Sequence, residues 1–238
     1  MKRDLASVAV AAALAVGTCC LAAQQAPPVF ITDAAAERIP NLRTLKNELQ
    51  EYHDCTCTCG CYAHDLDKQA DRAIVYLRQR AAHRRPAEKL ALILDVDETM
   101  LSNYQHLSDA DFGYVRKDAK AWEESGKSPA IPGTLRLYKE AQRLGVSIFI
   151  ITGRLESQRP ATERNLREQG YDGWQQLAMH PDVHGSETIG QFKAIVRGQI
   201  AASGYTLAVS VGDMWSDLKG KPEAEVSVKY PDPYDIIP

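Results

Sequence analysis

Three short runs of apolar residues constrain the fold of this chain more than any other feature of its sequence. They cover residues 90–94, 146–151 and 207–211, and weaker runs lie at 177–179 and 226–228. Continuous apolar runs of this length are typical of strands that are buried on both faces of a parallel sheet. The intervening segments have helical length and periodicity. The sequence therefore predicts an α/β fold, a doubly wound Rossmann-like parallel sheet with right-handed crossovers.

Apolar residues at helical spacing predict helices before and between these runs. One amphipathic helix is expected to begin after Pro40, and a second to begin at Asp65 as its N-cap. Later helices are expected to end at the glycines that follow them, because glycine readily takes the left-handed conformation of a helix C-terminus. Those glycines are Gly145, Gly170 and Gly204.

Length and charge narrow the class of protein. A chain of 238 residues allows one α/β domain or two very small ones. A formal net charge of -3 gives no general attraction to a nucleic acid polymer or to anionic lipid. Any anion that the protein binds must therefore be held by local groups.

The N-terminus has the features of an export signal. Met1-Lys2-Arg3 precedes an Ala-rich apolar stretch and small residues, which predicts a signal peptide over residues 1–23. An uncleaved anchor and a lipoprotein attached at Cys19 are the alternatives. With the signal removed, we expect a periplasmic or secreted protein without a membrane span.

The remaining chain divides into a helical lead-in over residues 24–85 and a core over residues 86–238. The lead-in contains four cysteines in one C-x-C-x-C-x-C run, flanked by His53 and His64. Local disulfides, a copper(I) or zinc site and free thiols are all compatible with this run, and an exported chain favours disulfides. The cysteines are Cys55, Cys57, Cys59 and Cys61.

One long connection interrupts the alternation of runs and helices. Residues 103–133 follow the first run and carry Tyr104, Phe112, Tyr114 and Trp122. Connections of this length are usually functional or disordered, and the aromatic content argues against disorder. We expect a small cap insertion beside the carboxyl edge of the sheet.

Polar residues follow the apolar runs at the points where ligands bind in open α/β sheets. Crowded carboxylates repel one another unless a cation lies among them, and oxygen ligands favour Mg²⁺. The candidate residues are Asp95, Asp97 and Thr99 after the first run, Thr152, Gly153 and Arg154 after the second, Asp213 and Asp217 after the third, and Lys193 in the helix before the third run.

Segments 93–103, 130–133 and 211–218 resemble the signature segments of the haloacid dehalogenase (HAD) superfamily of phosphohydrolases. The resemblance is greatest to its acid phosphatase branch, subfamily IIIB, which includes bacterial class C acid phosphatases and plant acid phosphatases and vegetative storage proteins. It extends over about residues 52–238. The sequence departs from the class C signature at His106, where that signature has Tyr.

The resemblance implies roles for the candidate residues. Asp95 would be the nucleophile that forms an aspartyl phosphate, and Asp97 the general acid and base. Asp95, Asp213 and the backbone carbonyl of Asp97 would hold Mg²⁺. Thr152 and Lys193 would bind the equatorial phosphate oxygens.

Five further residues are assigned less directly. Thr99 and Gly153 would line the substrate site, and Asp217 would orient Lys193 or a water on the metal. Arg154 would form a salt bridge or bind phosphate, and the salt bridge is favoured. Trp122 would stack on an aromatic leaving group, as in nucleoside monophosphates, or belong to the core of the cap.

The resemblance implies an exported Mg²⁺-dependent acid phosphatase acting on small-molecule phosphate monoesters, with a homodimer compatible with the sequence. The alternative is a non-catalytic surface, storage or metal-binding protein on the same fold. A receiver domain fits less well, because its phosphoacceptor follows a later strand than its first acidic pair.

His180 and His184 are expected to be solvated loop residues.

Overall fold

The computed structural model describes residues 40–57, 61–183 and 185–234. The predicted signal peptide, Cys59 and His184 lie outside the described residues. Within the described ranges, no helix is both long and apolar enough to cross a membrane.

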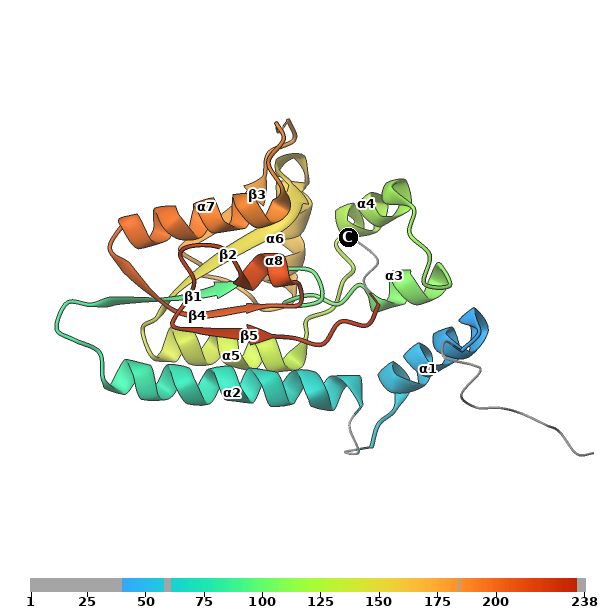
Figure 1. Ribbon diagram of the computed structural model, residues 1–238, viewed down its shortest axis with the longest axis horizontal. Helices are drawn as coiled ribbons and strands as arrows, with labels where there is room; N and C mark the ends of the chain where they lie inside the picture. Colours follow the sequence, from blue (N-terminus) through green and yellow to red (C-terminus); the bar gives the residue numbers. More distant parts are fainter. Residues whose placement is uncertain (1–39, 58–60, 184, 235–238) are drawn as a thin grey trace, which may run out of the picture. The chain divides into compact units, whose positions relative to one another are not determined.

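Five parallel strands form one sheet in the order β3-β2-β1-β4-β5 (Figure 1). All five predicted apolar runs are strands of this sheet. Their bounds are β1 Lys89–Leu94, β2 Ser147–Leu155, β3 Gln176–His180, β4 Tyr205–Gly212 and β5 Val226–Lys229.

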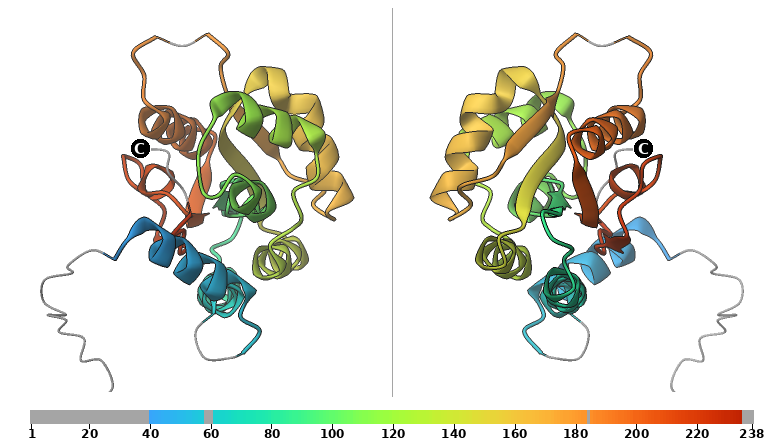
Figure 2. Two further views of the ribbon diagram at one scale, coloured as in Figure 1. Left: turned by 90° about the vertical axis from the view of Figure 1, so that its right-hand side faces the viewer. Right: turned by 90° about the vertical axis from the view of Figure 1, so that its left-hand side faces the viewer.

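Helices cover both faces of the sheet, which confirms the doubly wound fold. Figures 1 and 2 show α2 and α5 on one face and α7 on the other. The helices that flank the sheet are α2 Tyr62–Ala82, α5 Pro132–Arg143, α6 Arg159–Glu168 and α7 Ile189–Ala202, with the short η1 Glu156–Gln158 and α8 Trp215–Leu218.

The alternation of side chains along β1 explains why both faces are covered. Leu92 and Leu94 belong to the core cluster that includes α2 and α5, whereas Ala91 and Ile93 pack in the cluster that contains Phe192 of α7. Successive residues of a strand point to opposite faces, so a run without polar residues must be covered twice.

The described part of the lead-in contains α1 (Leu42–Asp54) and the whole of α2. The start of α1 agrees with the prediction, and the Asn41 side chain accepts a hydrogen bond from the backbone N–H of Thr44 at 3.0 Å. The predicted N-cap Asp65 is wrong, because Cys61 occupies the N-cap position of α2. Asp65 instead lies in the first turn and accepts a hydrogen bond from the Tyr52 hydroxyl at 2.8 Å.

A disulfide between Cys55 and Cys61 joins the end of α1 to the start of α2. Of the alternatives for the cysteine run, the disulfide is the one present for this pair. The bridge fixes the chain direction just before Tyr62, which is buried. This accounts for a helix start that propensity alone did not indicate.

The insertion contains two short helices, α3 (Tyr104–Asp109) and α4 (Arg116–Ser125), and α5 already begins within its last two predicted residues. Figure 1 shows α3 and α4 beyond the carboxyl ends of the strands. Phe112, between them, is buried. We refer to residues 103–131 as the cap.

The environment expected for His180 is wrong. His180 is the last residue of β3 and is buried, with its ring packed edge-on against Phe192. The weak apolar run at 177–179 did not show that the strand continues into this histidine.

Candidate active site

The strand order places the ends of β1 and β4 side by side. From β1 the chain proceeds outward through β2 to β3 and then returns to β4 on the other side of β1, which makes this edge the topological switch point. Leu94 pairs with Val211 of β4 and Ile150 of β2. The residues that follow these three strands therefore converge.

Three carboxylates meet at the switch point. Oxygen atoms of Asp95, Asp213 and Asp217 lie within 4.8 Å of one another, and all three residues are buried. Burial and the neighbouring carboxylates raise the pKa of Asp213 well above its usual range, and burial also raises that of Asp95 to about 7 despite Lys193. Such a cluster of hard oxygen donors fits a divalent cation, which would remove the repulsion.

Lys193 lies between two of these carboxylates. Its Nζ is 2.6 Å from Asp95 Oδ1 and also forms an ion pair with Asp217. Although burial disfavours the ammonium form, the two carboxylates outweigh it and raise the pKa of Lys193. Lys193 is therefore a buried, fully charged donor beside Asp95.

Thr99 fixes the position of Asp213. Its hydroxyl donates to Asp213 Oδ1 at 2.9 Å and accepts from the backbone N–H of Asp213 at 3.1 Å. Thr99 is completely buried. Thr99 therefore contacts the acidic cluster. It was expected to line the substrate site, and any effect on substrate would act through Asp213.

Gly212 makes room for Asp217. A Cβ atom on Gly212 would overlap the Asp217 side chain, which folds back from α8 onto the end of β4. Asp217 Oδ1 forms the ion pair with Lys193, and Asp217 Oδ2 accepts a hydrogen bond from the backbone N–H of Met214 at 2.8 Å. The Gly212–Asp217 turn therefore presents two carboxylates from one short segment.

Asp97 has a different set of partners. Arg154 donates to both of its carboxylate oxygens, at 2.5 and 3.0 Å, and the Asn103 side chain donates at 2.8 Å. Burial alone would raise the pKa of Asp97, but Arg154 and Asn103 outweigh it, and the pKa lies below its usual range. Arg154 thus forms the favoured salt bridge.

Thr152 and Gly153 lie on the stretch of β2 that extends beyond Ile150, the partner of Leu94. Thr152 is buried, and its hydroxyl accepts a hydrogen bond from the backbone N–H of Arg154 at 3.1 Å. Gly153 is half-buried. Both residues are at the same edge of the sheet as the carboxylates.

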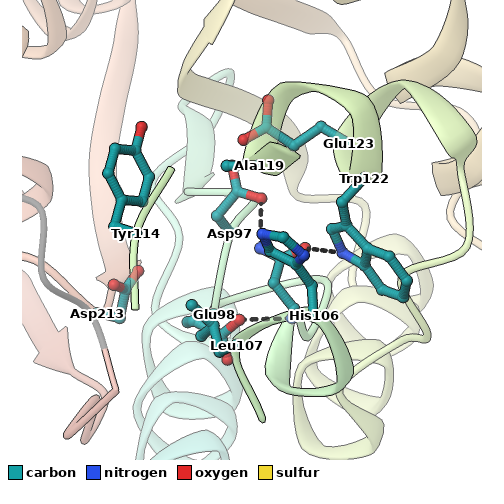
Figure 3. A pocket seen from close by; sticks show the side chains of 10 residues that line it. Asp97, Glu98, His106, Leu107, Tyr114, Ala119, Trp122, Glu123 and Asp213 are labelled. Atoms are coloured by element: carbon teal, nitrogen blue, oxygen red, sulfur yellow. Dashed lines mark hydrogen bonds between the residues drawn. The ribbon is translucent and has the colours of Figure 1, made fainter. Parts of the chain in front are cut away.

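A pocket lies between the cap and the carboxylates of Asp97, Glu98 and Asp213 (Figure 3). Trp122 lines it, and its indole N–H donates to the Asn103 side-chain oxygen at 2.9 Å. The same oxygen accepts from Ser128 at 2.8 Å, so Asn103 connects the cap to Asp97. Trp122 is stacked on His106, with ring centroids 5.8 Å apart.

Among the lining residues with a carboxyl or amide group, sequence reasoning missed Glu98, Asn103 and Glu123. Glu98 and Asn103 belong to the quoted signature segment and could have been proposed from it. Glu123 gave no sequence signal, because only the packing of α4 brings it over Asp97.

Comparisons with known proteins agree with this geometry. Residues 21–237 match the family described as HAD superfamily, subfamily IIIB (Acid phosphatase). The chain is 32% identical to acid phosphatase 1 of Solanum lycopersicum over 82% of this chain and 77% of that protein. It is 33% identical to vegetative storage protein 1 of Arabidopsis thaliana, over 61% of this chain and 55% of that protein.

Among solved structures, the class C acid phosphatase from Bacillus anthracis with tungstate bound superposes with a TM-score of 0.64 and 20% identity. The match covers 80% of this chain and 86% of that one, and at this identity it shows a common fold. The family match spans the sheet, the cap and every carboxylate described above. This chain belongs to subfamily IIIB of the HAD superfamily, the acid phosphatases.

Proposed function

We propose that the protein is an exported Mg²⁺-dependent acid phosphatase that hydrolyses phosphate monoesters through an aspartyl phosphate on Asp95. The observation that carries the proposal is the buried group of Asp95, Asp213, Asp217 and Lys193 at the switch point of the sheet. A buried nucleophile beside a cation and a cluster of hard oxygen ligands is suited to attack on an anion.

Asp95 and Asp213 would hold Mg²⁺, together with the backbone carbonyl of Asp97. The crowding of buried carboxylates supports this assignment, because burial and neighbouring negative charges raise their pKa values and a bound cation would relieve both effects. When bound, the ion supplies charge neutralisation between the attacking carboxylate and the phosphate.

In the first half-reaction, an Asp95 oxygen forms a bond to phosphorus while the bond from phosphorus to the alcohol oxygen breaks. Asp97 donates its carboxyl proton to that oxygen. In the second half-reaction, water attacks the phosphorus, Asp97 accepts a proton from it, and the Asp95 carboxylate leaves. Lys193 and Thr152 hold the equatorial oxygens, where charge accumulates.

The ion pair with Arg154 supports an acidic optimum. Asp97 must be protonated to act as the acid, and Arg154 keeps its pKa below the usual range. The protonated form is then scarce at neutral pH and becomes more abundant as the pH falls. Low pH rather than burial would supply the proton.

Trp122 supports a preference for aromatic leaving groups, such as those of nucleoside monophosphates. Its hydrogen bond to Asn103 gives it a second role, which a matched pair of variants separates. Trp122→Phe keeps an aromatic face and loses the N–H, whereas Trp122→Ala loses both. We expect the ratio of kcat/KM for aromatic esters to kcat/KM for aliphatic esters to fall in Trp122→Ala and to be retained in Trp122→Phe. The same ratio in both variants would contradict stacking.

Export is supported by the basic and then apolar N-terminal sequence, and a non-catalytic storage role is the second candidate. A storage relative has 33% identity to this chain, but Asp95, Asp97, Thr152, Lys193 and Asp213 are all present here. Turnover decides between the two candidates.

The test is hydrolysis of 4-nitrophenyl phosphate with Mg²⁺ or EDTA. We expect EDTA to abolish turnover and Asp95→Asn to reduce kcat by about 1,000-fold or more. The control is Asp118→Asn, which removes an exposed carboxylate of the cap and should leave kcat unchanged. Beryllium fluoride should modify wild-type Asp95; turnover that survives both EDTA and Asp95→Asn would overturn the proposal.

A further inference from the structure

The pocket beneath the cap has an unbalanced charge. Its lining includes four carboxylates, Asp97, Glu98, Glu123 and Asp213, and among the described residues neither Lys nor Arg lines it. The aromatic rings of Tyr114, Trp122 and His106 also line it. Figure 3 shows these rings and carboxylates around one space.

Three of the four carboxylates have partners that limit their effect on a ligand. Asp97 is paired with Arg154, and Asp213 is bonded to Thr99 in the acidic cluster. Glu98 is buried and accepts hydrogen bonds from the backbone N–H of Asn103 and from the Tyr62 hydroxyl.

Glu123 is the exception. It is half-buried on α4, and its hydrogen-bond partner is the neutral Gln158 side chain. Within the described part of the chain, no cationic side chain forms an ion pair with it. Figure 3 shows its carboxyl group on the side of the pocket where Asp97 lies.

Arg154 is the cationic side chain that acts on Glu123 and lowers its pKa, but this effect is smaller than the opposing effects of burial and Asp97. Arg154 is buried and directs its Nε and Nη2 to Asp97 and its Nη1 to Thr162. Glu124, the next residue of α4, is exposed and paired with Lys120. Burial and the proximity of Asp97 raise the pKa of Glu123 to about 7, so the site gains by accepting a cation.

The pocket is where the alcohol part of a substrate would lie. In the proposed reaction Asp97 protonates the oxygen that leaves, and Asp97 lines this pocket. The rest of the leaving group must then extend towards the cap. Aromatic rings beside a carboxylate form a favourable environment for an ammonium group.

We propose that Glu123 makes the enzyme select phosphate monoesters by the charge of their leaving group, with esters of cationic amine-bearing alcohols or phenols preferred and esters bearing a further anionic group excluded. This inference rests on the proposed function and specifies its substrate class. It is compatible with stacking on Trp122, because the aromatic ring and the charge are recognised by different residues.

The test uses three phenyl phosphates that differ in one para substituent, namely O-phosphotyramine with an ammonium, 4-ethylphenyl phosphate with no charge, and 3-(4-phosphooxyphenyl)propionate with a carboxylate. They share one aromatic ring and similar phenolic leaving groups, so kcat/KM reports the effect of charge. The panel is run at pH 7, because the pKa of Glu123 is raised to about 7 and a substantial part of its carboxyl group is ionised there.

We expect kcat/KM to fall from the cationic through the neutral to the anionic ester, with about tenfold or more between the extremes. Glu123→Gln keeps the shape and the contact to Gln158 and should bring the three values to within a few-fold of one another. Glu123→Asp keeps the charge and should retain the order. Glu124→Gln, the matched control on the exposed face of α4, should leave kcat/KM for all three esters unchanged.

The outcomes separate the two proposals. Turnover of all three esters without a charge order, or an order that survives Glu123→Gln, overturns the assignment of Glu123 and leaves the phosphatase proposal intact. Failure of the wild-type enzyme to hydrolyse any of the three in the presence of Mg²⁺, at acidic pH as well as at pH 7, overturns the proposed function, and this inference with it.

Discussion

Arg154 controls the protonation of the residue proposed as general acid. Its guanidinium contacts both oxygens of Asp97, and its own side chain is only 1% exposed, so the pair is shielded on one side. A bidentate pair of this kind stabilises the carboxylate form strongly. Arg154 is therefore the neighbour that does most to lower the pKa of Asp97.

We expect Arg154→Met to raise the pKa of Asp97, because burial would then act without an opposing positive charge. The protonated form of Asp97 would persist to higher pH, and the pH at which kcat/KM is greatest should move up by about one unit or more. The pH dependence of kcat/KM for 4-nitrophenyl phosphate measures this. An unchanged optimum, with correctly folded variant protein, would show that Asp97 is not the titrating acid.

The predicted residues that directly follow a strand share one property, which is that strand direction alone determines their position. Asp95 and Asp213 directly follow β1 and β4, and parallel strands end at one edge. Glu123 and the contact between Asn103 and Trp122 depend instead on how the cap packs, and no local pattern reports that.

At the scale of elements, α7 connects the acidic cluster of the site to the loop behind it. Lys193 and Arg197 are one helical turn apart on its buried face. While Lys193 contacts the carboxylates, Arg197 donates to the backbone carbonyls of Asp217, Gly220 and Pro222 at 2.8 to 3.0 Å. One helix face thus positions both the side chain and the backbone of Asp217.

We expect Arg197→Met to lower the free energy of unfolding by about 3 kcal/mol, because it leaves several buried carbonyl groups without a donor. Chemical denaturation measures this. The control is Arg143→Met, which removes an exposed arginine that pairs with Glu140 and should cost below about 1 kcal/mol. Equal losses in the two variants would show that the Arg197 contacts add no stability.

Element boundaries show where sequence patterns fail. The end of α5 before Gly145 was predicted correctly, because a glycine with positive φ there ends the helix locally. The start of α2 was predicted four residues late, because a disulfide and the burial of Tyr62 determine it. A disulfide and the burial of one side chain, rather than propensity, decided that boundary.

At the scale of the whole molecule, the site concentrates buried negative charge that the rest of the fold must stabilise. Burial raises the pKa of Asp95 to about 7 and that of Glu98 to about 8, and it raises that of Asp213 as well. In the unfolded chain these carboxyl groups titrate near pH 4. The metal-free fold is therefore favoured when they are protonated.

The sign of the pH dependence follows from these shifts. A carboxyl group whose pKa is raised by folding contributes its full stability below about pH 4 and loses it as the pH rises through the folded value, here about 7 to 8. Carboxyl groups whose pKa is lowered by folding, such as Glu140, lose their contribution to stability only as the pH falls below about 5. Between pH 5 and pH 8 the buried acidic cluster should thus dominate the change.

We expect the melting temperature in EDTA to fall between pH 5 and pH 8, and Mg²⁺ to restore it mainly at pH 8, because protons compete with the metal for the same carboxylates. At a concentration about 100 times its dissociation constant, Mg²⁺ should raise the melting temperature at pH 8 by about 5 to 10 °C. Asp213→Asn should reduce this increase, whereas Asp118→Asn should not. Metal binding to these buried carboxyl groups requires the loss of protons between pH 5 and pH 8. If thermal denaturation showed the same Mg²⁺ effect at both pH values, the metal would not be binding these groups.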